Sequence, residues 1–181
     1  MSARSAAVRE GRLSLAVQYA VRARGVPTPA QLRRWARAAL ERDARVTVRI
    51  VGDGEARRLN RTYRGKDRPT NVLTFVMSER PRLAGDLALC APLIAREARD
   101  QGKSAIAHYA HLVVHGVLHL QGYDHENGRE ARAMERRETQ IVTRLGYPDP
   151  YSLDGRPAPA RRTPGRRAAS RPAAHVSPLH G

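Results

Sequence analysis

The feature that most constrains this chain is a cluster of histidines within one long apolar segment. Five of the seven histidines lie within residues 108–125. An apolar helix over about 104–119, ended by Gly122, is expected to carry most of them. Residues four apart in a helix share a face, with Cβ atoms about 5–6 Å apart. His115 and His119 form such a pair, so two imidazoles are expected to converge beside a buried helix.

A third histidine follows at a spacing that suits a metal site. Gly122 can adopt the left-handed conformation that ends a helix and reverses the chain. That reversal can bring His125 back towards His115 and His119. Three neutral nitrogens leave the fourth tetrahedral position for water, which is the arrangement of a catalytic zinc. The sequence therefore predicts one Zn²⁺ ion bound by these three histidines.

The neighbouring histidines are interpreted differently. His111 is separated from His119 by about 12 Å of helix rise, so the two cannot bind one ion. A pair made of His111 and His115 has no third ligand at a natural distance in the sequence. His111 is therefore expected to donate a hydrogen bond to a ligand or to lie in the core, and His108 to be a core or surface residue. Cys90 could close a tetrahedral site, but one cysteine at a strand end is more typical of a small core residue.

The pattern of apolar residues predicts alternating strands and helices around this segment. Thr28 and Gln31, with Pro29 between them, form the signature of a capped helix start. A mixed sheet of about four strands packed against about five helices, an α+β domain, is expected. The strands are predicted at 13–21, 45–51, 71–76 and 83–90. One helix is predicted to start at residue 29, and a short one with Leu59 and Tyr63 inward is predicted to end at Gly65. Three more helices are predicted at 91–99, 104–119 and 129–145.

Composition divides the chain into three parts. Residues 1–12 are expected to be flexible, 13–152 to form the domain, and 153–181 to be a disordered tail, because this last part has six arginines, five prolines and almost no large apolar side chain. The chain carries 33 basic and 17 acidic residues, a net charge of +16, and removal of the tail still leaves +11. Such a surplus favours binding to polyanions. One cysteine, no apolar run that could span a membrane and no signal-like start predict a cytoplasmic protein.

The spacing of the three histidines is also that of the metzincin metalloproteases, H-x-x-x-H-x-x-G-x-x-H. In those enzymes a glutamate directly after the first histidine is the general base. Gly116 occupies that position here. A metzincin-like protease remains an alternative function, but it would lack its base.

The string HGVLHLQGYDH at 115–125 resembles the signature of the YbeY family of bacterial zinc-dependent endoribonucleases. LNRTYRGKDRPTNVLTF at 59–75, AGDLALC at 84–90 and LGYPDPY at 145–151 resemble other segments of that family, in the same order. The resemblance covers roughly 13–152 and does not include the basic tail. It implies a single zincin-like domain that acts on single-stranded RNA, in 16S rRNA 3′-end maturation and ribosome quality control. The implied partners are rRNA, the ribosome and the Era GTPase, with neither DNA nor a membrane expected.

The resemblance also implies roles for individual residues. His115, His119 and His125 correspond to the zinc ligands, and Arg64 to a functional arginine beside the metal. A guanidinium there would stabilise the negative charge that develops on the phosphate oxygens during cleavage. Asp124 is a candidate to orient a histidine or accept a proton, or it caps a turn; the substrate's 2′-hydroxyl is an alternative nucleophile. A second alternative function is a non-catalytic ribosome-assembly factor in which zinc only holds the fold.

Overall fold

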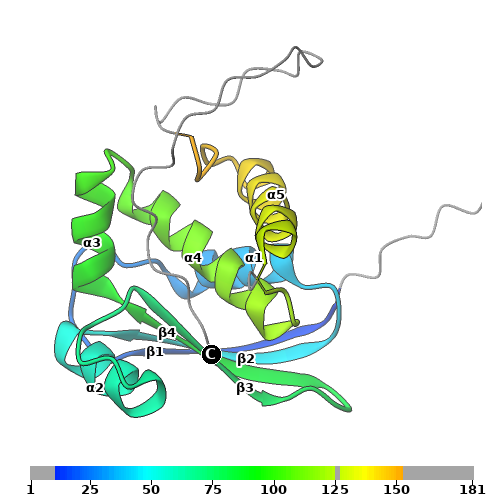
Figure 1. The fold of residues 1–181 in the computed structure, drawn as a ribbon, viewed down its shortest axis with the longest axis horizontal. Helices are drawn as coiled ribbons and strands as arrows, with labels where there is room; N and C mark the ends of the chain where they lie inside the picture. The colour runs from blue at the N-terminus through cyan, green and yellow to red at the C-terminus, as the bar shows by residue number, and fades with distance from the viewer. Residues whose placement is uncertain (1–10, 125–126, 153–181) are drawn as a thin grey trace, which may run out of the picture.

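The computed structural model describes residues 11–124 and 127–152 and confirms the α+β prediction. The described part contains one four-stranded mixed sheet and five helices (Figure 1). In chain order the elements are β1 (Leu13–Tyr19), α1 (Pro29–Ala39), β2 (Ala44–Val51), α2 (Asp53–Arg64), β3 (Val72–Ser78), β4 (Leu83–Cys90), α3 (Ala91–Asp100), α4 (Ala105–Leu120) and α5 (Gly128–Arg144).

The sheet has the strand order β1-β2-β4-β3. β1 pairs with β2 and β2 with β4 in parallel, and β3 pairs with β4 in the antiparallel direction. β4 is therefore an inner strand, and β3 forms one edge of the sheet. β4 runs directly into α3, and α3 is followed by α4, the one described helix that carries histidines.

The two faces of the sheet have different surroundings. Val46, Val48 and Ile50 on β2 are fully buried, whereas Thr47 and Arg49, which alternate with them, are partly exposed and Arg45 is exposed. The helices α1, α4 and α5 lie on one side of the sheet, and α2 lies on the other (Figure 1). α4 packs on β3 and β4 and also contacts α1, α3 and α5, so it is the central helix of the core.

The start of α1 was predicted correctly at the level of single hydrogen bonds. The Thr28 hydroxyl accepts from the Gln31 backbone N–H, and the Gln31 side chain accepts from the Thr28 backbone N–H. Trp35, which is fully buried, donates from Nε1 to the Tyr147 hydroxyl at 3.2 Å. This contact joins α1 to the segment that follows α5 and closes the core at that end.

Tyr63 was expected to point inward, and this was wrong: 64% of the residue is exposed, with its ring edge-on to Phe75 at 4.9 Å between centroids. The predicted flexible start and basic tail lie largely outside the described residues, and the boundaries at 12 and 152 stay predictions. No described helix has the length and apolarity required to span a bilayer.

Candidate metal centre

The histidines of α4 form a row along one face of the helix. α4 begins after Ser104, whose hydroxyl accepts from the Ala107 backbone N–H. The ring centroids of His108 and His111 are 6.4 Å apart, those of His111 and His115 6.2 Å, and those of His115 and His119 4.6 Å. The spacing of three, four and four residues places all four rings on one side. The expected approach of His115 to His119 is therefore present.

A buried glutamate on α5 faces this row. Glu138 is fully buried, with Oε1 2.5 Å from Nδ1 of His115 and Oε2 2.8 Å from Nε2 of His111. The Tyr151 hydroxyl also donates to Oε2. Burial acts to raise the pKa of Glu138, but the hydrogen bonds from the two histidines outweigh it and hold that pKa well below its usual range. The carboxylate is therefore ionised and accepts all three hydrogen bonds.

These residues form a candidate metal site. Within the described part of the chain, His111, His115 and Glu138 are a group whose potential ligand atoms all lie within 4.8 Å of one another. The interpretation that a His111/His115 pair has no third ligand at a natural distance in the sequence did not consider Glu138, which α5 brings next to both rings. Glu138 was missed because only apolar residues were counted as inward. It lies four residues after Met134 and three before Ile141, on the buried stripe of α5, and that placement of a charge was the available signal.

The predicted triad can be followed only in part. His115 and His119 are adjacent, and Gly122 has the expected left-handed backbone with φ of 94°. His125 lies outside the described residues, which stop at Asp124 and resume at 127. The triad therefore stays a prediction, as does the role of Asp124.

The donor set fits a zinc ion. Imidazole nitrogen and carboxylate oxygen are both zinc ligands. With Nδ1 of His115 donating to the Glu138 carboxylate, Nε2 is the ring nitrogen that remains to bind a metal ion. A carboxylate that hydrogen-bonds the far nitrogen of a metal-binding histidine is a common arrangement. The residues therefore suit zinc whether Glu138 is a ligand or supports one.

Gly116 lies where a metzincin has its general base. A Cβ atom at this position would lie 2.5 Å from Cδ2 of Leu87 and 3.3 Å from Cγ2 of Thr74. Leu87 is fully buried on β4. A glutamate at residue 116 would thus point into the interface between α4 and the sheet rather than towards the histidine row, so the geometry of a metzincin base is excluded here.

Arg64 ends α2, where Gly65 follows with φ of 68°. Its side chain is partly buried. Burial lowers the pKa of the guanidinium, and the positive charge of Arg68 lowers it further. The two like charges make this end of α2 a region of positive potential that would favour an anion. The functional role of Arg64 stays a prediction.

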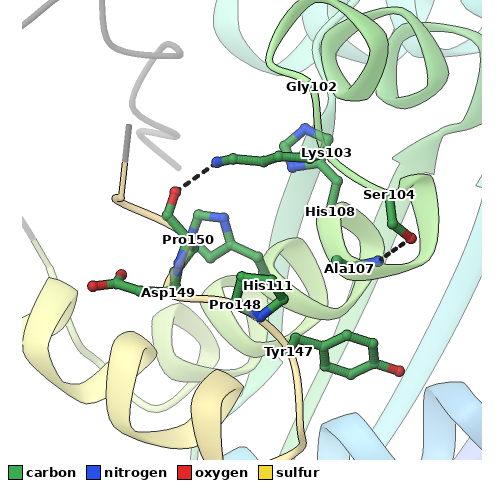
Figure 2. Close-up of a pocket in the computed structure, with 10 residues that line it drawn as sticks. All are labelled: Gly102, Lys103, Ser104, Ala107, His108, His111, Tyr147, Pro148, Asp149 and Pro150. Carbon is green, nitrogen blue, oxygen red and sulfur yellow. Dashed lines mark hydrogen bonds between the residues drawn. The ribbon is translucent and has the colours of Figure 1, made fainter. Parts of the chain in front are cut away.

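A pocket of about 200 Å³ lies at the start of α4, between that helix and the segment after α5 (Figure 2). His108 and His111 both line it, and Lys103 reaches across to donate from Nζ to the Pro150 carbonyl at 2.6 Å. His111 therefore has the pocket on one side and Glu138 on the other. The pocket is lined by Gly102, Lys103, Ser104, Ala107, His108, His111, Tyr147, Pro148, Asp149 and Pro150.

The fold and the histidine–carboxylate cluster define an α+β protein with a candidate metal centre between two helices. Comparison with known proteins gives the family. The model of the family described as Endoribonuclease YbeY matches residues 24–146. The chain is 61% identical over 145 residues to Endoribonuclease YbeY of Aromatoleum aromaticum, covering 78% of this chain and 94% of that protein. It is 54% identical to Endoribonuclease YbeY of Methylobacillus flagellatus, covering 80% and 97%.

A solved structure agrees with this assignment. The solution structure of TM1509 from Thermotoga maritima superposes with a TM-score of 0.52 at 26% sequence identity, covering 73% of this chain and 89% of that one. The chain belongs to the YbeY family.

Proposed function

We propose that this protein is a metal-dependent endoribonuclease that cleaves single-stranded RNA, with one Zn²⁺ ion bound by His115, His119 and His125. The observation that carries the proposal is the hydrogen bond from Nδ1 of His115 to the buried Glu138 carboxylate. This hydrogen bond leaves Nε2 of His115 as the nitrogen that can bind a metal ion. The ring centroids of His115 and His119 are 4.6 Å apart. The endoribonuclease names of the relatives support the reaction class.

The choice of ligands follows from the hydrogen bonds of Glu138. If the ion were bound by Glu138 and by the nitrogens of His111 and His115 that face it, the two ring protons between these groups would have to leave. If it is bound through Nε2 of His115 and by His119, all three hydrogen bonds of the carboxylate persist. The second arrangement keeps a buried charge fully paired, and we therefore favour it.

A bound zinc ion would supply a Lewis acid that polarises a phosphoryl oxygen and lowers the pKa of water. The chain's own residues position the metal ligands and neutralise negative charge on the substrate phosphate. Glu138 fixes the orientation of His115, and Arg64 offers a guanidinium to the phosphate oxygens, on which negative charge increases in the transition state. Asp124 adjoins His125 in sequence and is our candidate to orient that histidine or accept a proton.

The net charge of +16 supplies affinity for RNA without a need to read its sequence. This binding should weaken steeply as salt concentration rises. By its family, we assign the protein to 16S rRNA 3′-end maturation and ribosome quality control in the cytoplasm, with the ribosome and the Era GTPase as partners. A single, buried, reduced Cys90 is compatible with that reducing compartment.

The test is cleavage of a single-stranded RNA by the full chain before and after chelation, and after zinc is added back. We expect activity to disappear with the metal and to return with zinc. His119→Ala should lose both bound zinc and cleavage while circular dichroism still reports a folded protein. Cleavage that survives chelation, or that is unchanged in a folded His119→Ala protein, would refute the proposal.

A further inference from the structure

Glu138 is an unusual residue for the inner stripe of a helix. α5 turns one face towards the core, and Glu138 lies on that face with Met134, Ile141 and Val142, all of them buried. An ionised carboxylate in such a place is costly unless every oxygen is hydrogen-bonded. Packing alone does not explain a glutamate at this buried position, so the role of Glu138 is sought in its hydrogen-bond partners.

The three partners of Glu138 use both of its oxygens. Oε1 accepts from Nδ1 of His115, and Oε2 accepts from Nε2 of His111 and from the Tyr151 hydroxyl. An ionised carboxylate only accepts hydrogen bonds, so each ring must carry its proton on the nitrogen that faces it. The carboxylate thereby selects one tautomer of His115 and fixes the rotation of that ring.

Tyr151 is itself held in place. Its backbone N–H donates to Oδ1 of Asp149 at 3.0 Å, and that oxygen also accepts from the Thr139 hydroxyl of α5 at 3.2 Å. The Tyr151 ring meets the His111 ring edge-on at 5.3 Å between centroids. The segment that follows α5 thus closes over the carboxylate and places a hydroxyl donor beside Oε2.

We propose that Glu138, assisted by Tyr151, is a positioning residue that orients His115 with Nε2 towards the metal and is not itself a ligand. This inference rests on the proposed function, because it takes His115 and His119 as ligands of one ion. It adds α5 and the segment after it to the parts of the chain on which metal affinity depends.

The chain contains a matched control at the other end of the histidine row. Nε2 of His108 lies 2.8 Å from Oε2 of Glu97, and the same carboxylate accepts from Nδ2 of Asn71 at 3.1 Å. His108 is 3% exposed. This pair has the same chemistry as Glu138 with His115, but His108 is not a proposed ligand. Glu97→Gln and Glu138→Gln therefore disturb similar pairs with different expected consequences for the metal.

The experiment measures zinc affinity of the full chain by competition with a chromophoric chelator. Glu138→Gln keeps the shape but offers one acceptor oxygen to three donors, and we expect zinc affinity to fall about 10–100-fold, as for other residues that support metal ligands. Tyr151→Phe removes one hydroxyl only and should lower affinity less. Glu97→Gln should leave affinity within about twofold. ¹⁵N NMR of the histidine rings in the unsubstituted protein should show the proton of His115 on Nδ1.

Two further variants separate a positioning role from direct ligation. His119→Ala should abolish stoichiometric zinc binding, whereas His111→Asn should retain one zinc. The reverse pattern would place the ion on His111, His115 and Glu138 and would overturn the inference. Equal zinc affinities for Glu138→Gln and Glu97→Gln would also overturn it, even if RNA cleavage remained zinc-dependent. Failure of the proposed function would give a different result. The zinc affinities of the variants would follow the expected order, but the parent protein would not cleave RNA.

Discussion

A methyl group added at Gly116 tests how closely α4 must approach the sheet. The new Cβ of Gly116→Ala would lie 2.5 Å from Cδ2 of Leu87, well inside van der Waals contact, and 3.3 Å from Cγ2 of Thr74. Leu87 is fully buried and must change rotamer or push the helix away. Overpacking of this kind costs about 1–3 kcal/mol.

A helical alanine offsets part of that cost. Replacing glycine by alanine inside a helix gains about 0.5–1 kcal/mol. We therefore expect Gly116→Ala to lower the free energy of unfolding by about 1 kcal/mol. Gly54→Ala in α2 is the matched control, because its Cβ would meet only an Arg58 nitrogen at 3.8 Å. That variant should be neutral or slightly more stable than the parent.

The assay is urea unfolding of the full chain with chelator present throughout, so that metal binding does not contribute to stability. Leu87→Val removes both Cδ atoms from the contact. In that background Gly116→Ala should no longer destabilise, which gives a coupling energy of about 1 kcal/mol or more. If Gly116→Ala is as stable as the parent and shows no coupling to Leu87, the packing explanation for the glycine is wrong.

Three further outcomes are expected. Gly85→Ala should destabilise by about 2 kcal/mol or more in urea, because its Cβ would lie 2.7 Å from the Phe75 carbonyl oxygen, which cannot rotate away. Burial raises the pKa of Cys90 to about 11. The Cys90 thiol should therefore react with a disulfide reagent at pH 8 about 100-fold more slowly than in the unfolded chain. The free energy of unfolding should also fall as pH rises from about 9 to 11, because only the thiol of the unfolded chain ionises in that range. Thr28→Ala removes the cap that pairs with Gln31 and should cost about 1 kcal/mol in thermal unfolding, whereas a change below a few tenths would contradict the observed cap.

The parts of the fold that depend on local sequence could be predicted. The capping box of Thr28 and Gln31, the alternation along β2 and the left-handed Gly122 each depend on residues a few positions apart. The burial of Tyr63 was predicted wrongly. Helical periodicity shows which residues share a face of the helix, but it does not show whether another element packs against that face. α2 lies on the other side of the sheet from α1, α4 and α5 (Figure 1). The Tyr63 residue on this helix is 64% exposed.

The candidate site was predictable only along one helix. His115 and His119 share a face of α4 by spacing alone, so their proximity followed from the sequence. Glu138 comes from another helix, and its contact with His111 and His115 depends on how α5 docks against α4. No spacing rule relates residues 23 and 27 positions apart on separate helices, which is why the carboxylate was missed.

The chain order of the Glu138 cluster has a consequence for biosynthesis. During translation α4 is complete before Glu138 has been added, and Tyr151 is added later still. Until then nothing from α5 restrains the rings of His111 and His115, and either nitrogen of each can carry the proton. A nascent chain that meets zinc early would therefore offer an unselected set of donors, so correct loading of the ion should be one of the last events in maturation of the protein.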